Sequence, residues 1–143
     1  MNLPEAILEI GKQNDWSEAN DALEGKLSQE EIVKIRLDTA DFYADRAEEL
    51  SVTSPHLASE MLFKAIVEGM KALGDYFGLK KDIKELPAFL TDILGDWIDN
   101  TWEIGKRLHY DGYIFEFLQS DDVKEYLNYV REFLKNCKIA ILY

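Results

Sequence analysis

Apolar residues recur every three or four positions along most of this chain, which is the spacing of an amphipathic α-helix. One such stripe runs through residues 29–51 and consists of Val33, Leu37, Ala40, Ala44 and Ala47. Another runs through residues 121–142 and consists of Val123, Leu127, Val130, Leu134, Cys137 and Ile141. No convincing strand hairpin or internal repeat interrupts this pattern, so the sequence predicts an all-α protein.

Local signals place the ends of the two longest helices. The segment Ser28-Gln29-Glu30-Glu31 has the form of a capping box, in which the Ser and the Glu three residues later bond to each other's backbone N–H groups. The pair Ser54-Pro55 then restarts the chain as a cap with Pro at the first helical position. We expect this second helix to end near Phe77, because Gly78 follows.

The second long helix carries a stripe rich in small residues: Ala58, Leu62, Ala65, Gly69 and Ala72. A glycine inside a helix costs roughly 1 kcal/mol relative to alanine, so we expect Gly69 to admit the close approach of a facing helix. This helix is therefore predicted to be central.

Further helices follow towards the C-terminus. Pro87 opens one, the pattern resumes beyond Gly95, and Asp111-Gly112 is typical of a turn or a helix stop. Ser120 or Asp121 is expected to cap the last helix. The prediction is an antiparallel helical bundle of about five to six helices, with short connections, over residues 28–143.

Residues 1–27 break into shorter pieces and are predicted to form an N-terminal helical appendage of one or two short helices. Trp16 supports a docked rather than a frayed segment, because an indole ring this large favours burial.

Composition and charge narrow the class of protein. The chain has 143 residues, 47% of them hydrophobic, and a formal net charge of -12, which fits one globular domain. Its acidity disfavours extended, sequence-independent DNA binding, and no apolar run approaches the roughly 20 residues that span a membrane. The single Cys137 excludes an intrachain disulfide and is consistent with a cytoplasmic location.

The sequence offers few residues for catalysis. Its two histidines, His56 and His109, form no metal-ligand spacing with each other or with Cys137, so we expect neither a metal nor another cofactor. Carboxylates at helical spacing, such as Glu60 and Glu68 on either side of Lys64, are interpreted as surface ion pairs.

The two histidines differ in their surroundings. His56 lies just after a helix start, where we expect it to be exposed. His109 follows Lys106 and Arg107 and precedes Tyr113 by four residues, so it could serve as an acid, a base or a phosphate donor. The alternative is an ordinary histidine bonded to a carboxylate such as Asp111 or packed against Trp102 or Tyr113.

Several of these features together resemble a known family. They are the caps at Ser28 and Ser54, the pair of long small-residue helices, Ala58-Ser59-Glu60 followed by an apolar run with Lys71, and Trp102 through Leu108-His109 with Tyr113. Over roughly residues 28–140 the chain resembles the archaeal PaREP family of the HEPN-like superfamily of helical bundles.

The resemblance implies a specific catalytic motif. Many HEPN ribonucleases use an Arg followed, after four to six residues, by a His, and assemble this pair twice across a homodimer. With His109 as the His, the Arg would fall at residues 102–104, which are Trp102, Glu103 and Ile104. Arg107 does not substitute, because on a helix it projects about 200° away from His109. The motif is thus broken, although Tyr113 matches the aromatic residue of the family.

The residues beside Tyr113 also differ from the family. Gly112 and Ile114 stand where an aromatic residue and an acid often flank that tyrosine.

These observations favour a non-catalytic HEPN-like module that forms a homodimer and binds a partner protein or a nucleotide- or RNA-like ligand. The residues expected to line its binding site are His109, Tyr113, Lys106, Arg107 and Trp102. Two alternatives stay open: a metal-independent ribonuclease with His109 as general base, and a purely structural helper. Aromatic residues beside the main stripes, such as Phe42 and Tyr129, support self-association.

Overall fold

The structure, a computed structural model, describes residues 16–141. The elements in this range are α2 (Trp16–Leu23), α3 (Gln29–Leu50), α4 (Pro55–Phe77), α5 (Leu86–Leu94), α6 (Asp96–Arg107), the π-helix η1 (Leu108–Ile114) and α7 (Ser120–Ala140). The described range contains no strand, which confirms the predicted all-α class. Helix α2 falls in the predicted N-terminal appendage, and residues 1–15 of that appendage lie outside the described part.

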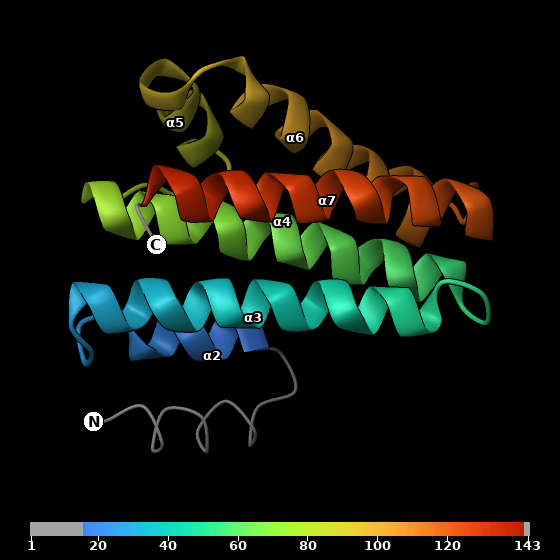
Figure 1. Cartoon of the computed structure of the whole chain (residues 1–143), viewed down its shortest axis with the longest axis horizontal. Helices are drawn as coiled ribbons and strands as arrows, with labels where there is room; N and C mark the ends of the chain where they lie inside the picture. The colour runs from blue at the N-terminus through green and yellow to red at the C-terminus, as the bar shows by residue number, and fades with distance from the viewer. Residues whose placement is uncertain (1–15, 142–143) are drawn as a thin grey trace.

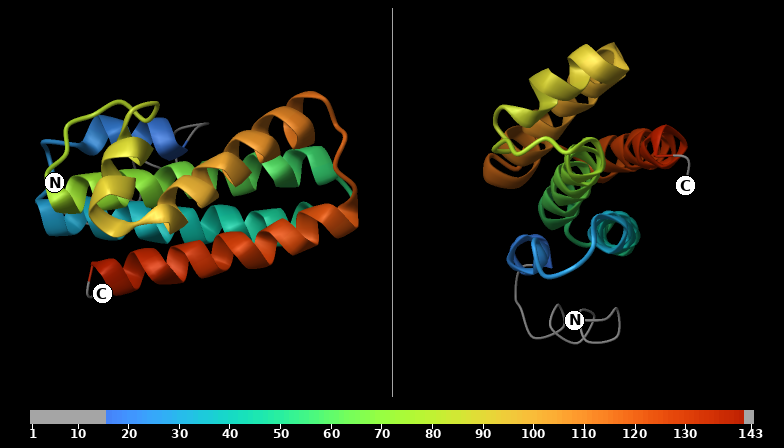
Figure 2. Two further views of the ribbon diagram at one scale, coloured as in Figure 1. Left: turned by 90° about the horizontal axis from the view of Figure 1, so that it is seen from above. Right: turned by 90° about the vertical axis from the view of Figure 1, so that its left-hand side faces the viewer.

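The three longest helices, α3, α4 and α7, lie side by side; α3 runs antiparallel to both α4 and α7, which run in the same direction (Figure 1). Helix α2 packs beside α3, whereas α5 and α6 cover the opposite side of α4, as the end-on view shows (Figure 2). Helix α4 contacts α3, α5, α6, η1 and α7, so the predicted central helix is confirmed. In the described residues, no helix combines the length and apolarity needed to cross a membrane.

The helix boundaries follow the local signals in most places. The capping box is present, with the Ser28 N–H donating to Glu31 at 3.0 Å and the Glu31 N–H donating to Ser28 at 3.1 Å. Gly78 ends α4 with φ of +71°, a left-handed conformation that glycine adopts without steric cost. The predicted cap of α7 is wrong by one residue. Gln119, not Ser120 or Asp121, holds the N-cap position, and its N–H donates to Asp122.

The core consists of the predicted stripes. Every residue named for the stripes of α3, α4 and α7 is buried. Gly69 performs the predicted role, because a Cβ atom at this position would stand only 2.6 Å from Cε2 of Phe133 on α7. The missing side chain therefore lets α7 pack directly on the backbone of α4.

The predicted turn at Asp111-Gly112 is wrong. The chain continues there as the π-helix η1, and the Phe115 N–H donates to the Tyr110 carbonyl five residues earlier at 2.9 Å. Gly112 is buried against α4, where a Cβ atom would overlap the side chain of Ser59. The glycine thus serves a close contact between two helices rather than a change of direction.

Two helical glycines of the core, Gly69 and Gly105, give a matched test. We expect Gly69→Ala to lower the free energy of unfolding by about 1–3 kcal/mol, because the new methyl group collides with Phe133. Gly105→Ala should instead raise it by up to about 1 kcal/mol through helix propensity, since the nearest atom, Cγ2 of Ile66, would lie at an ordinary 3.4 Å. Urea denaturation measures both, and equal effects of the two substitutions would contradict the packing argument.

Candidate functional site

His109 lies in η1 and is held by a carboxylate of α4. Its Nδ1 is 2.7 Å from Oε1 of Glu60, and the two side chains are 27% and 14% exposed. Because a carboxylate can only accept, Nδ1 carries the proton of this hydrogen bond. The contact fixes the orientation of the imidazole ring and leaves Nε2 as its other polar atom.

Aromatic rings surround the imidazole. The ring centroid of His109 is 4.8 Å from that of Phe63, 5.0 Å from that of Tyr110 and 6.1 Å from that of Tyr113. Trp102 lies one layer further away, with its ring 6.0 Å from Phe63. The structure therefore brings Tyr113 to His109 and connects Trp102 to it through Phe63.

The two cations predicted to line the binding site, Lys106 and Arg107, lie beside acids rather than beside His109. Lys106 and Arg107 are both exposed, and each faces an acid of its own helical segment. Nζ of Lys106 is 2.7 Å from Glu103, and Nε of Arg107 is 3.6 Å from Asp111. In the described part of the chain, His109 thus contacts one carboxylate and three rings, with no cation among them.

Two interpretations of the carboxylates need correction. Glu60 was expected to be a surface residue, but it binds His109, while Asp111, one of the partners named in the alternative interpretation of His109, lies beside Arg107. Glu68 was also expected at the surface and is fully buried. His56 is partly exposed, and its Nδ1 is 3.5 Å from Glu116.

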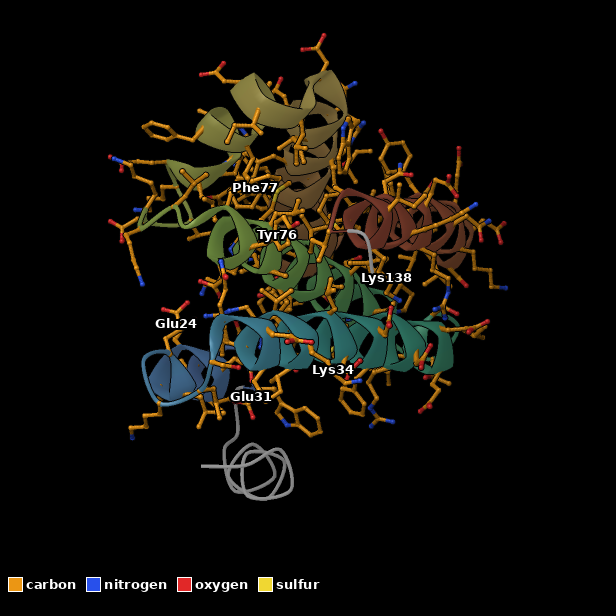
Figure 3. The ribbon with its side chains drawn as sticks, turned by 60° about the vertical axis from the view of Figure 1, so that its left-hand side comes forward. Glu24, Glu31, Lys34, Tyr76, Phe77 and Lys138 are labelled. Atoms are coloured by element: carbon orange, nitrogen blue, oxygen red, sulfur yellow. The ribbon has the colours of Figure 1, made fainter. Side chains whose placement is uncertain are left out.

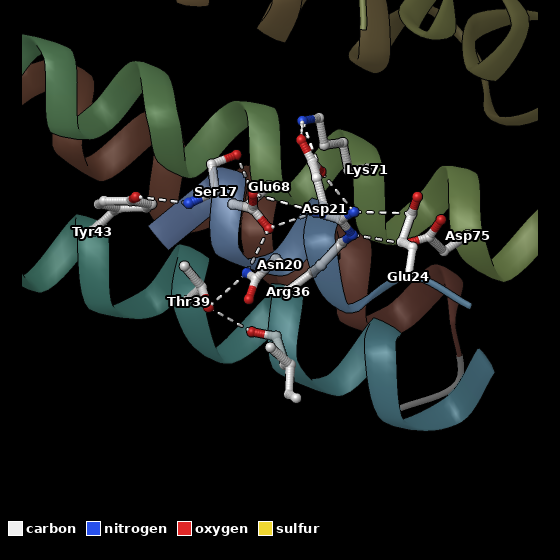
Figure 4. A network of polar contacts seen from close by, with 11 residues as sticks. Ser17, Asn20, Asp21, Glu24, Arg36, Thr39, Tyr43, Glu68, Lys71 and Asp75 are labelled. Carbon is white, nitrogen blue, oxygen red and sulfur yellow. Dashed lines mark hydrogen bonds and ion pairs between the residues drawn. The ribbon is translucent and has the colours of Figure 1, made fainter. Parts of the chain in front are cut away.

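A second polar site, which the sequence analysis missed, surrounds the buried guanidinium of Arg36 (Figure 4). This side chain is only 1% exposed and contacts four carboxylates. Its Nε donates to Asp75 at 2.7 Å, its Nη1 to Glu68 at 3.2 Å, and its Nη2 to Asp21 and Glu24 at 2.9 Å each. Asp21 of α2, Glu24 directly after α2, and Glu68 and Asp75 of α4 supply these acids, so one side chain of α3 ties three helices together.

Helix α2 binds the same network through further polar side chains. Ser17 donates a short hydrogen bond to Glu68, and Nδ2 of Asn20 donates to Glu68 at 3.1 Å and to Thr39 at 3.0 Å. Nζ of Lys71 donates to Asp21 at 2.9 Å. Helix α2 is thus docked by hydrogen bonds and ion pairs as well as by apolar burial.

One aromatic contact completes the docking of α2. The ring of Trp16 stacks on Phe42 of α3, with centroids 4.3 Å apart and planes inclined by 4°. The residue that suggested a docked appendage therefore packs on the body of the bundle.

Burial and proximity shift the pKa values in this network. Burial raises the pKa of Glu68, and the surrounding carboxylates raise that of Arg36 against the opposing effect of its burial. Burial and a hydrogen bond with Glu24 raise the pKa of Asp75 to about 7, while the same bond lowers the pKa of Glu24. The carboxyl of Asp75 therefore changes its protonation near neutral pH, beside a Glu24 whose pKa is lowered.

The sequence does contain a signal for this network. Arg36 is three residues after Val33 and four before Ala40, so it lies on the buried stripe of α3. Glu68 is likewise three residues after Ala65 and four before Ala72. An Arg and a Glu each at a core register of adjacent helices indicate a buried ion pair.

The fold and these sites define an all-α helical bundle with one buried polar network and one histidine–carboxylate pair in an aromatic environment. No protein-family model, no curated protein and no solved structure matches the chain. Within residues 16–141, no group of three or more His, Cys, Asp or Glu side chains is arranged to hold a metal ion.

The raised pKa of Asp75 predicts a pH-dependent stability. Between about pH 4 and 7 the folded protein binds more protons at Asp75 than the unfolded chain, so this residue's contribution to stability falls as the pH rises. Asp75→Asn mimics the protonated side chain and removes the effect. We therefore compare the free energies of unfolding of the wild type and of Asp75→Asn. The difference, wild type minus variant, should fall by roughly 1 kcal/mol or less for each unit by which the pH rises. Urea denaturation from pH 5 to 8 measures this difference, and a flat difference would contradict the prediction.

Proposed function

We propose that this chain is a non-catalytic HEPN-like binding module of the cytoplasm that self-associates through the surface of η1 and the loop after it. We call this surface the η1 face. It consists of Tyr110, Tyr113, Ile114, Phe115 and Phe117. The observation that carries the proposal is the exposure of these five large apolar side chains, which ranges from 38% to 69% within eight residues of sequence.

The η1 face is held in place by its own backbone. The N–H groups of Phe115 and Phe117 donate to Tyr110 and Asp111 at 2.9 and 2.7 Å. Between the two phenylalanines, Glu116 has φ of +57°, which is uncommon for a residue other than glycine. The two rings stack with centroids 5.5 Å apart. A preorganised apolar surface loses little conformational entropy on binding, which favours association.

The charges around this face suit a second copy of the chain. Arg107 stands beside Asp111, and the side chains of Lys106, Arg107, Asp111 and Glu116 are between 42% and 64% exposed. A two-fold interface places the same patch of each copy against the other, so cations of one copy can meet acids of its partner. The acids, and a net charge of -12, disfavour a nucleic acid in this place.

The contacts of His109 support a structural role behind this face. Glu60 fixes the imidazole, and the imidazole packs against Tyr110 and Tyr113, two members of the face. Catalysis of phosphate transfer would need a cation to stabilise the developing charge. The two nearest in sequence, Lys106 and Arg107, face Glu103 and Asp111 instead.

Self-association through the η1 face predicts a clear effect of one double variant. Phe115→Ser with Phe117→Ser should convert a dimer into a monomer in sedimentation velocity at micromolar concentration, because it removes the most exposed apolar area of the face. Ile139→Ser, which changes a 61% exposed residue on α7, is the matched control and should leave the dimer intact. A monomeric wild-type protein would refute the proposal.

One observation favours the second candidate, a metal-independent ribonuclease. A carboxylate bound to Nδ1 of a histidine is the arrangement that orients a general base, and Glu60 and His109 have it. In that case a cation from the partner copy would have to stabilise the phosphate.

Cleavage of labelled RNA separates the two functions. We expect no cleavage by the wild-type protein, and no difference between it and His109→Ala, because no cation is bound next to His109 in the described structure. Ile104→Arg restores the family spacing at a half-buried position, and activity gained only by this variant would indicate a disarmed nuclease. Cleavage by the unmodified protein that His109→Ala abolishes would overturn the non-catalytic proposal.

A further inference from the structure

A groove of about 540 Å³ lies beside the Arg36 network, at the C-terminal end of α4. It is bounded by α2, α3, α4, the connection 78–85 and the start of α5. Glu24 points from α2 towards this connection (Figure 3). The volume is in the range of pockets that hold small molecules.

The two sides of the groove carry opposite charges. The acidic wall consists of Asp21 of α2, Glu24 directly after α2, and Asp75 of α4. The connection contributes the basic wall, which is Lys80, Lys81 and Lys84, and apolar surface comes from Leu79, Ile83 and Leu86. With Arg36, Lys71 and Asp82 included, the lining has five cations and four carboxylates, a net charge of +1 in a chain of -12.

The cations of the helices and those of the connection differ in availability. Arg36 and Lys71 are occupied by the carboxylates of the network. Among the lysines of the connection, Lys80 acts on Glu24 only through its charge, which helps to lower the pKa of that carboxyl. Lys84 forms no ion pair with any residue in the range 16–141. The basic wall therefore retains ammonium groups that can bind an anion.

We propose that this groove binds a small phosphate monoester that carries neighbouring hydroxyl groups, the chemistry shared by sugar phosphates and mononucleotides. The phosphate is held by Lys80 and Lys84, whose ammonium groups donate charge-assisted hydrogen bonds. The hydroxyl groups donate to the carboxylate oxygens of Glu24 and Asp75, and the ring packs on Leu79 and Ile83.

The acidic wall selects this ligand over simpler ones. A bare phosphate ion can form ion pairs with the lysines but is repelled by the nearby carboxylates, so it binds weakly. A neutral sugar can form hydrogen bonds with the carboxylates only. Since the described carboxylates form no metal-binding group and the lining has a positive balance, a divalent cation or a polyamine fits less well. Only a molecule with both groups uses both walls.

This site is independent of the η1 face. Lys71 and Asp75, near the C-terminal end of α4, line the groove, whereas η1 packs on Ser59 near the start of the same helix. Failure of ligand binding therefore leaves the self-association proposal standing, and a monomeric protein leaves the groove intact.

Isothermal titration calorimetry of the full chain tests the proposal with four probes: ribose 5-phosphate, AMP, inorganic phosphate and ribose. We expect ribose 5-phosphate to bind at least about tenfold more tightly than inorganic phosphate or ribose. If AMP binds as tightly as ribose 5-phosphate, a mononucleotide is an accepted source of the phosphate. If AMP does not bind in this way, the ligand is a sugar phosphate. No heat of binding from either ester at millimolar concentration would overturn the proposal.

Two variants locate the binding. The double variant Lys80→Gln with Lys84→Gln should weaken the binding of ribose 5-phosphate at least about tenfold. The matched control, Lys124→Gln with Lys135→Gln, makes the same charge change at exposed positions of α7 and should have no such effect. Equal losses in the two double variants would show that only the overall charge matters and would overturn the site.

Glu24→Gln distinguishes the role of the acidic wall. It should weaken the binding of ribose 5-phosphate, because a hydroxyl acceptor loses its charge. It should strengthen the binding of inorganic phosphate, because a repulsive charge disappears. Glu24 is 42% exposed, so this variant is expected to fold. Strengthened binding of both probes would refute the role of the carboxylates and with it the proposed ligand class.

Discussion

The buried charge of Arg36 is the constraint on which the arrangement of the first half of the bundle depends. A guanidinium withdrawn from water is tolerated only when its donors are bonded and its charge is matched. The acids that do this are Asp21 of α2, Glu24 directly after α2, and Glu68 and Asp75 of α4. Asp21 and Glu24 thus satisfy part of a buried charge, so α2 belongs energetically to the bundle although it is only eight residues long.

The second half depends on close contacts with α4 rather than on charge. Gly69 admits Phe133 of α7, and Gly112 brings η1 onto Ser59. Ser59 is followed directly by Glu60, so the contact that positions η1 also places His109 within hydrogen-bonding distance of its carboxylate. Two small residues in contact, Ser59 of α4 and Gly112 of η1, thus determine the geometry of the histidine site.

The sequence predicted the helices well and the polar sites poorly, for physical reasons that particular residues illustrate. Periodicity reports which face of a helix is buried, and this was sufficient for the stripes of α3, α4 and α7. The residue type at Gly112 could not distinguish a turn from a close contact, because glycine suits both. The partner of His109 is 49 positions away, at Glu60, and only the packing of η1 on α4 brings it there. Arg36 and Glu68 could have been recognised from their core registers, had charged residues been tested against the stripe.

Helix α4 unites these features because its acids meet partners from different elements. Glu60, Glu68 and Asp75 are separated by eight and seven residues, so at 100° per residue they lie within about 80° of one another around the helix. Glu60 holds η1, whereas Glu68 and Asp75 hold α3 and, through Arg36, α2. The first and last of these acids are about 22 Å apart along the helix, which is more than twice the Debye length at physiological ionic strength. Charge at the groove is therefore screened from charge at the η1 face, and any communication between the two ends would have to pass through the packing of α4 itself.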